Sequence, residues 1–573
     1  MKYTLIGSGN TYSPIETVLK NRGITEDLFN LDESVVEDYN NLDNIIDGVE
    51  LLLKHIKNGS RIKMITDSDF DGKSSATTIY RYIKDEFGVE IEYQLHSGKQ
   101  HGISPDITIE DGIKLVIVPD AGTSDFKQQK ELFLRGIDVL ILDHHECDEG
   151  YSKHATVINN QLSKNIKNKQ LSGVGIVYKF LKAMDDYLYI DRANNYLDLV
   201  ALGNIADVMD LHSNETRYLV KKGLENINNT FLQALIDDNE FDLDGKFNIE
   251  KVGWTLAPKV NGCIRSGTFK EKEDMFKAFI SDDYDFCLKV AKQCKKVKAR
   301  QDRAVKTGMT KIEDDIKISE KDRVLVLSSK GASKSFTGLI AGKLTDKYGL
   351  PIIMYSAEKE EYIQDKIVVP KDIVAHIISR HNDRVVKPFC KYMGHKCTVL
   401  SGSCRGNNSI TETFRSDLLE TGLFVYCNGH EGAFGWKCKK DNLQKIKKIL
   451  NEKYKDKEVV SGKEYQVDFI LEHEEIIDDF VNEIAQYEDE WGNGISVPLV
   501  VFRNIPIYIE YDNIKGLNII FKVNGVKFIK KYATNVLKES LLYQKLKVDV
   551  VGKCCMNSYD GKGMVEVVEL DIK

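Results

Sequence analysis

Short apolar runs that end in acidic or histidine residues, and that alternate with helix-like segments, constrain the fold of this chain more than any other feature. The runs are IKMIT before Asp67, EIEYQLH at 90–96, KLVIVPD ending at Asp120 and DVLILD ending at Asp143. Strand-like runs separated by helical segments are typical of a parallel α/β sheet. Because ligands of open α/β sheets gather beyond the carboxyl ends of the strands, these acids are the first candidates for a functional site.

The first of these strand ends carries three carboxylates at alternate positions, Asp67, Asp69 and Asp71, followed by Gly72. Like charges this close repel one another unless they are protonated or bound to cations, and hard divalent cations prefer oxygen ligands. A solvated acidic turn and an EF-hand loop are the alternatives. An EF-hand loop needs a Glu at its twelfth position, where this chain has Thr78, so the spacing argues against that loop.

Three further positions carry groups that bind metals. Asp120 stands where an apolar strand stops, and His144 and His145 follow Asp143 at the end of the next strand. Neutral imidazole nitrogens suit manganese and other transition metals. Asp207 lies in the apolar helical stretch LVALGNIADVMDL, where burial is costly without a charged partner. A surface histidine pair and a helix-end cap are the alternatives for the last two positions.

Length and composition limit the classes of protein to which the chain can belong. A length of 573 residues predicts several domains. A net charge of -8 argues against a protein that coats nucleic acid through overall charge, so contacts with nucleic acid must be local. Eleven cysteines at irregular spacing predict reduced thiols. The sequence has neither an apolar run of roughly 20 residues nor a signal-peptide pattern, so we expect a cytoplasmic protein without a membrane segment.

In this order and spacing, DxDxDG, a strand-terminal Asp, DHH and an ADVxxL-type segment resemble the four metal-site motifs of the DHH phosphodiesterase family. The resemblance implies two divalent cations, Mn²⁺ or Mg²⁺, and phosphodiester hydrolysis by two-metal catalysis. It also implies that Asp120 bridges the ions, that Asp143 orients the histidines and that His145 lies over the scissile phosphate. The implied metal ligands are Asp67, Asp69, Asp71, Asp120, His144 and Asp207.

Similarity to the RecJ exonucleases within that family extends over nearly all of the chain and adds candidates for binding phosphate or nucleic acid. Asn261 and Arg265 lie in GWTLAPKVNGCIRSGT. Ser403 and Arg405 lie in LSGSCRGNNSI, and His430 lies in CNGHEGAFG. A serine and an arginine flanked by glycines suit the close approach of a phosphate. A solvated surface arginine is the alternative for Arg265.

The resemblance also fixes the expected architecture, which is an α/β fold with a parallel-sheet catalytic domain, an α/β DHH-associated domain and a C-terminal β-barrel like an OB-fold. Within the N-terminal lead-in, residues 15–58 are expected to be helical. In the barrel, Tyr508, Tyr511 and Phe521 are candidates for stacking on bases, with core packing as the alternative. The predicted domains are a helical lead-in at 1–60, the DHH catalytic domain at 61–285, a connecting helix at 286–320, the DHH-associated domain at 321–458 and the OB-like barrel at 459–573.

The function implied by the resemblance is that of a single-stranded-DNA-specific 5′ to 3′ exonuclease in DNA repair, recombination or replication. The expected partners are single-stranded DNA, with RNA left open, and a single-strand-binding protein or a helicase. We expect a monomer. Two alternatives are a DHH hydrolase of short oligoribonucleotides or cyclic dinucleotides, and an inactive RecJ-like adaptor. The long lead-in and the β-rich C-terminal region favour the exonuclease.

Overall fold

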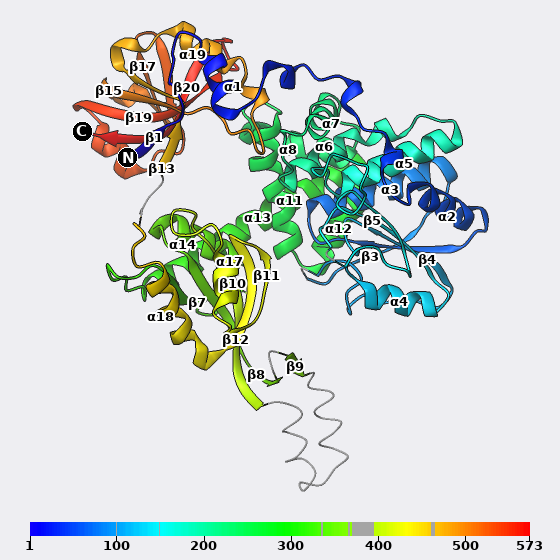
Figure 1. The fold of residues 1–573 in the computed structure, drawn as a ribbon. Coiled ribbons are helices and arrows are strands. Elements are labelled where there is room, and N and C mark those ends of the chain that lie inside the picture. Colours follow the sequence, from blue (N-terminus) through cyan, green and yellow to red (C-terminus); the bar gives the residue numbers. More distant parts are fainter. Residues whose placement is uncertain (99, 148, 334–335, 365–366, 370–394, 460–463) are drawn as a thin grey trace. The chain divides into compact units, whose positions relative to one another are not determined.

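The computed structural model describes residues 1–573 except 99, 148, 334–335, 365–366, 370–394 and 460–463 (Figure 1). The chain forms two compact units. The larger unit comprises Tyr3–Lys298 with Tyr465–Lys573, and the smaller unit comprises Ala299–Glu464 with Met1–Lys2. A helix of 30 residues, α13 (Tyr284–Glu313), covers most of the predicted connecting helix. The domain boundaries given above stay a prediction.

The larger unit is built on a five-stranded sheet in the order β3-β2-β4-β5-β6, and all of its strands run parallel. The prediction of a parallel α/β fold is therefore confirmed. Each of the four apolar runs that define this prediction matches one of the strands to within about one residue at either end, apart from the run at 90–96, which extends beyond its strand at its start. The strands are β2 (Arg61–Thr66), β3 (Glu92–Leu95), β4 (Ile113–Pro119), β5 (Asp138–Asp143) and β6 (Thr156–Asn159).

Helices cover both faces of this sheet (Figure 1). Alternate residues of a strand enter different cores: Met64 of β2 packs with helices α3 and α5, whereas Ile65 packs in a separate cluster with Leu132 of α4. Burial on both faces explains why the strands are almost continuously apolar rather than alternating. The helices that flank the strands are α2 (Ile45–Lys57), α3 (Phe70–Phe87), α4 (Phe126–Leu134), α5 (Gly173–Leu188) and α6 (Leu197–Ala206).

A helical region follows the sheet and joins the same hydrophobic core. Its helices are α7 (Asn214–Glu225), α8 (Thr230–Asp238), α9 (Glu240–Leu243), α10 (Ile249–Lys251), α11 (Ala257–Ser266) and α12 (Phe269–Phe279). A π-helical turn at Val252–Leu256 leads into α11. Within the described ranges, no helix combines the length and the apolar character that a bilayer-spanning segment needs.

The N-terminal lead-in is helical at both ends of the range predicted to be helical. Helix α1 (Pro14–Arg22) ends at Gly23, whose φ of 66° is left-handed. Three short 3-10 turns separate it from α2. The prediction of helix over 15–58 is therefore correct at its two ends and wrong between them. Arg22 pairs with Asp468 at 2.6 Å, and β1 (Lys2–Leu5) pairs with β13 (Glu464–Val467), which ties the lead-in to the C-terminal region.

The C-terminal region forms a seven-stranded mixed sheet in the order β14-β15-β19-β20-β18-β17-β16. Closure of this sheet into an OB-like barrel stays a prediction. Phe521 is buried and its ring stacks on Phe528, so core packing is the correct alternative for it, whereas Tyr508 and Tyr511 are exposed. The elements are β14 (Phe469–Glu472), α19 (Asp478–Ala485), β15 (Val500–Tyr508), β16 (Ile514–Lys515), β17 (Asn518–Val523), β18 (Val526–Lys530), α20 (Asn535–Leu541), β19 (Lys545–Met556) and β20 (Gly563–Ile572).

The smaller unit has a six-stranded sheet with the path β11-β12-β10-β8-β7, in which β9 also pairs with β8. Strands β7 and β8 are parallel, and the other pairs are antiparallel. The elements are β7 (Leu325–Ser328), α14 (Thr337–Tyr348), β8 (Ile352–Gln364), β9 (Ile367–Val369), β10 (His395–Arg405), α17 (Phe414–Glu420), β11 (Phe424–His430), β12 (Ala433–Lys439) and α18 (Leu443–Lys453).

Candidate metal centre

The first acidic segment forms the turn between strand β2 and helix α3. Asp69 is the N-cap of α3, and its side chain accepts a hydrogen bond of 2.9 Å from the Gly72 amide. A Cβ on Gly72 would lie 2.5 Å from Cβ of Asp67, so the turn closes only with glycine at this position. Asp71 lies in the first turn of α3, where the positive end of the helix dipole favours a carboxylate. The turn therefore gathers three carboxylates at one strand end.

Asp120 follows β4 in a left-handed backbone conformation with a φ of 65°. Aspartate tolerates this conformation better than most residues do. The side chain is buried, and Gly173 at the start of α5 lies so close that a Cβ there would be 2.2 Å from Oδ1 of Asp120. The backbone of α5 thus forms a wall against this carboxylate.

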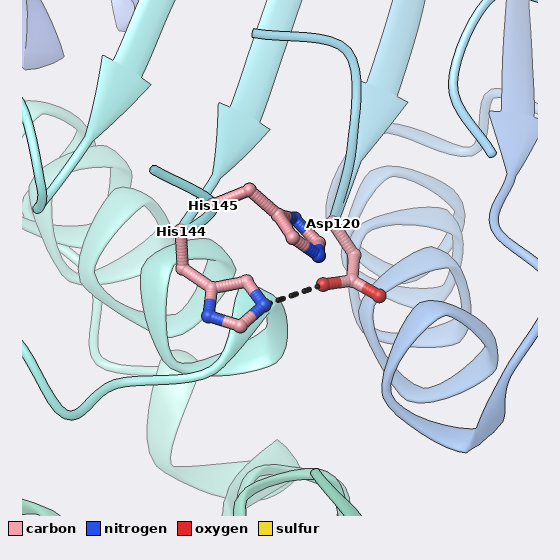
Figure 2. Close-up of side chains that lie close together, drawn as sticks. All are labelled: Asp120, His144 and His145. Atoms are coloured by element: carbon pink, nitrogen blue, oxygen red, sulfur yellow. Dashed lines mark ion pairs between the residues drawn. The ribbon is translucent and has the colours of Figure 1, made fainter. Parts of the chain in front are cut away.

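Asp143, His144 and His145 leave the end of β5 in different directions. Oδ1 of Asp143 accepts hydrogen bonds from the His144 amide at 2.7 Å and from Nδ1 of His145 at 2.8 Å. Nε2 of His144 lies 3.2 Å from Oδ1 of Asp120, as Figure 2 shows. The same nitrogen lies 3.6 Å from Oδ2 of Asp207 and 4.0 Å from Oδ2 of Asp71. His144 therefore joins acids from three other segments of the chain.

Asp71 and Asp207 are brought together by α5 and α6. Asp207 is the C-cap of α6, and Gly203 in the same helix lies so close to Asp71 that a Cβ would be 2.4 Å from Oδ1 of Asp71. Ser172 Oγ and the Gly173 amide donate hydrogen bonds to the Asp71 carboxylate at 2.9 and 2.6 Å. These contacts fix the carboxylate at the N-terminus of α5.

Among the described residues, the side chains that could hold a metal ion fall into three groups within this site. The groups are Asp67 with Asp69 and His101, Asp71 with His144 and Asp207, and Asp120 with His144 and His145. Every residue predicted to bind metal is a member of one of them. His145, which is predicted to contact the phosphate, also lies within ligand distance of Asp120 and His144.

The electrostatics of the site favour a bound cation. Burial and then the neighbouring acids raise the pKa of Asp69 to about 6, that of Asp207 to about 8 and that of Asp120 well above its usual range. Among the described residues, no hydrogen bond reaches the buried Oδ1 of Asp120, although His144 lies near it. Buried carboxylates that repel one another and keep an acceptor without a donor fit a divalent cation with oxygen and imidazole ligands.

The surroundings shift the pKa values of the two histidines in opposite directions. Burial lowers the pKa of His144, which is then neutral and offers a lone pair to a metal. Burial opposes charge on His145 as well, but its hydrogen bond and charge pairing with Asp143 raise the pKa of His145 to about 9. The pairing with Asp143 thus favours the protonated form of His145 in the metal-free protein, which suits contact with a phosphate. The separate roles predicted for the two histidines agree with these states and stay a prediction.

Two residues of the site are absent from the sequence-based prediction. Nδ1 of His101 lies 2.7 Å from Oδ2 of Asp67, and Lys73 is buried beneath the acidic turn. Nζ of Lys73 donates hydrogen bonds to Oγ1 of Thr66 at 2.8 Å and to the carbonyl oxygen of Asp67 at 2.6 Å. His101 follows β3, the strand next to β2, so its place after a parallel strand is the signal that could have found it.

The predicted nucleic-acid residues lie in both units. In the larger unit, Oδ1 of Asn261 accepts a hydrogen bond of 3.1 Å from the Phe70 amide beside the acidic turn, and Arg265 is exposed one turn later on α11. In the smaller unit, Arg405 and His430 both pair with Ala433 of β12. Ser403, two residues before Arg405 on β10, lies 3.1 Å from Thr337 through their hydroxyl oxygens. Their roles in binding stay a prediction.

Comparisons with known proteins agree with this geometry. The DHH family, N-terminal domain, matches residues 61–204. One relative, from Bacillus subtilis (strain 168), carries the name SPbeta prophage-derived single-strand DNA-specific exonuclease YorK. It is 33% identical over 605 residues, which cover 100% of this chain and 98% of that protein. The single-stranded-DNA-specific exonuclease RecJ of Bacillus subtilis is 27% identical over 318 residues, which cover 54% of this chain and 39% of RecJ.

Solved structures show the same fold. RecJ from Thermus thermophilus in complex with Mn²⁺ superposes with a TM-score of 0.71 at 17% identity and covers 100% of this chain and 78% of that one. The structure of the same protein in complex with Mg²⁺ gives a TM-score of 0.66 at 17% identity. At this identity the likeness concerns the fold.

Proposed function

Because the chain belongs to the DHH family, we propose that it is a metal-dependent enzyme that removes nucleotides from the 5′ end of single-stranded DNA by hydrolysing phosphodiester bonds. The observation that carries the proposal is the convergence of Asp71, Asp120 and Asp207 on Nε2 of His144, within 3.2 to 4.0 Å. The name of the relative that matches 100% of this chain supports single-stranded DNA as the substrate.

Two divalent cations are proposed to bind at the acids and at one imidazole, that of His144, within the three clusters described above. Mn²⁺ and Mg²⁺ are the candidates, because both are bound by the RecJ structures that share this fold. When bound, a pair of such ions supplies an activated water and stabilises charge on the attacking and leaving oxygens. The metal ligands in this proposal are Asp67, Asp69, Asp71, Asp120, His144 and Asp207.

The side chains around these ligands have separate tasks in the proposed reaction. His145, held as a cation by Asp143 at 2.8 Å, donates a hydrogen bond to a non-bridging oxygen of the scissile phosphate. Asp143 also accepts from the His144 amide, so one carboxylate orients both histidines. Lys73 stays buried and protonated, and it offsets part of the negative charge of the acidic turn. The scissile phosphate is thus proposed to accept a hydrogen bond from His145 next to the carboxylates that hold the cations.

The smaller unit is proposed to bind the phosphate backbone or the 5′ end. Arg405 and His430 reach the same end of its sheet through their shared partner Ala433, and Ser403 lies on the same strand as Arg405. An arginine offers two parallel donors to a phosphate, and a neighbouring hydroxyl and imidazole extend that set. A monomeric state, a cytoplasmic location and binding of a single-strand-binding protein or helicase are further parts of the proposal.

The test is a degradation assay with a long single-stranded DNA that is labelled at either end. With Mn²⁺ or Mg²⁺, we expect 5′-labelled DNA to release mononucleotides at once and 3′-labelled DNA to shorten progressively. EDTA and the substitution Asp120→Asn should both abolish the reaction. Exclusive hydrolysis of dinucleotides or cyclic dinucleotides would replace this proposal with the short-oligonucleotide hydrolase. Inactivity on every nucleic acid would favour the adaptor.

A further inference from the structure

The loop between β3 and β4 places an imidazole on the acidic turn. His101 lies in this loop, and its Nδ1 is 2.7 Å from Oδ2 of Asp67. Asp67 is buried, whereas 60% of the His101 side chain is exposed. The ring therefore covers the solvent side of a buried carboxylate. Asp69 also lies within ligand distance of both residues.

Hydrogen bonds on the C-terminal side of His101 fix the path of the loop. The Gly102 amide lies 3.4 Å from Oδ1 of Asp67, and the Ile103 amide donates to Asp125 at 2.7 Å. Gly102 has a left-handed φ of 61°, and a Cβ there would lie 2.1 Å from the Asp125 carboxylate. The buried side chain of Ile103 anchors the loop in the core beneath the sheet. His101 is thus held in place by its neighbours.

Further contacts close the loop on its other side. Asp106 accepts hydrogen bonds from the amide and hydroxyl of Ser97 at 3.1 and 3.0 Å and from the hydroxyl of Ser104. Nζ of Lys272 on α12 donates to the carbonyl oxygen of Ser97 at 3.1 Å. Among the described residues of the loop, Ser97 before His101 and Ile103 after it are both held by hydrogen bonds, which supports a defined position of the imidazole.

We propose that His101 is an additional ligand of the cation held by Asp67 and Asp69, and that its imidazole gives this position a preference for Mn²⁺ over Mg²⁺. Neighbouring ligands of an octahedral ion with bonds of about 2.1 Å lie roughly 3 Å apart, close to the separation of His101 and Asp67. Imidazole nitrogen suits manganese, whereas magnesium prefers oxygen ligands. This inference rests on the proposed metal-dependent function.

An alternative role for His101 is to orient Asp67 through an N–H donor without touching the cation. The side-chain amide of asparagine can keep that donor near the position of Nδ1, but it is a poor substitute for imidazole as a ligand of manganese. The pair of variants His101→Asn and His101→Ala therefore separates the two roles. If His101 only orients Asp67, His101→Asn should bind metal like the unmodified chain and only His101→Ala should be weakened.

The experiment measures binding of Mn²⁺ and of Mg²⁺ to the metal-free full chain by calorimetry, without DNA. We expect both variants to weaken Mn²⁺ binding at one site at least about tenfold, because loss of even an outer partner of a metal site typically costs 10–100-fold. Binding of Mg²⁺ should change no more than about threefold, since the carboxylates remain. Electron spin echo of bound Mn²⁺ should show less nitrogen coupling in both variants.

A matched control comes from another histidine of the same unit. Nδ1 of His212 lies 2.7 Å from Oδ1 of Asp210, the same separation as in the His101 pair, and His212 is outside the three metal-binding groups. His212→Asn should leave both affinities unchanged. Equal Mn²⁺ affinity and nitrogen coupling in His101→Asn and the unmodified chain would overturn the inference. Because no DNA is present, an unmodified chain that binds Mn²⁺ but degrades no DNA would refute only the proposed function.

Discussion

Replacing Asp207 by asparagine should stabilise the metal-free protein while it destroys the metal site. Burial and then Asp71 and Asp69 raise the pKa of Asp207 from its ordinary 3.8 to about 8. In the unfolded chain this carboxyl ionises near pH 4, so between about pH 4 and pH 8 the folded state binds more protons than the unfolded state. Stability of the metal-free protein therefore falls as the pH rises through this window. Asparagine cannot ionise and removes that dependence.

The magnitude follows from the same shift. At pH 7 the cost of holding Asp207 in the folded site is at most about 4 kcal/mol, at roughly 1.4 kcal/mol for each tenfold change in proton affinity. Solvent screens a side chain that is 33% exposed, so we expect a gain of roughly 2 kcal/mol from Asp207→Asn. For the larger unit, which has roughly 400 residues, this gain raises the Tm by about 2 °C. At pH 5 the gain should shrink to about 1 °C or less.

The assay is thermal unfolding in EDTA at pH 5 and pH 8, repeated with saturating Mn²⁺. The metal should stabilise the unmodified chain by about 3 kcal/mol at a hundredfold excess over its Kd, and the variant by less. The difference between the two Tm values should therefore become smaller or change sign when Mn²⁺ is present. Asp191→Asn, at a side chain that is 72% exposed, is the control and should change neither Tm. An equal gain at both pH values, or no gain at pH 8, would refute the repulsion on which the reasoning depends.

Three other substitutions test the remaining parts of the site. His145→Gln should lower kcat on single-stranded DNA about 100-fold with Mn²⁺ affinity unchanged. Since the pKa of His145 is about 9, the rate of the unmodified chain should fall as the pH rises through 9. The same decline in the variant would contradict the role of His145 as a donor to the phosphate. Lys73→Met should destabilise the metal-free protein by about 3 kcal/mol in urea, because two buried charge-assisted bonds are lost, and unchanged stability would exclude Lys73 as an internal counter-charge. Arg405→Ala should raise KM about tenfold for 5′-phosphorylated DNA only, with Arg415→Ala as the control; equal use of both kinds of end would argue against a phosphate site.

The sequence predicts the acids of the centre because parallel strands bring their carboxyl ends to one edge of a sheet. Asp67 and Asp120 each follow such a strand and Asp143 is the last residue of one, and the structure has them at that edge. His101 also follows a parallel strand, but β3 ends at Leu95 and not directly before it, so the contact of His101 with Asp67 depends on the path of the loop. That path is set by the left-handed Gly102 and by Asp125, two residues that carry no metal-site pattern.

Other differences have local causes. The prediction of a helical stretch over 15–58 rests on apolar residues spaced at three and four. Between α1 and α2 it is wrong, because Gly23 ends α1 in a left-handed conformation and the Asp32 and Asp38 side chains cap short 3-10 turns. Along the C-terminal strands, Phe521 faces the core and Tyr508 faces solvent. Period-two patterns predict that neighbouring positions differ, but which face is buried depends on the element packed against the sheet.

Gly173 and Gly203 offer a means of separating active homologues of this chain from inactive ones. A Cβ atom on Gly173 would lie 2.2 Å from Oδ1 of Asp120, and a Cβ atom on Gly203 would lie 2.4 Å from Oδ1 of Asp71. Even a single methyl group at either position would therefore collide with a carboxylate oxygen. A homologue that retains every acid but has alanine at either position should therefore have lost the capacity to load its ions. Surveys that count only acids and histidines would misclassify such a homologue, whereas a survey that also reads these two glycines would not.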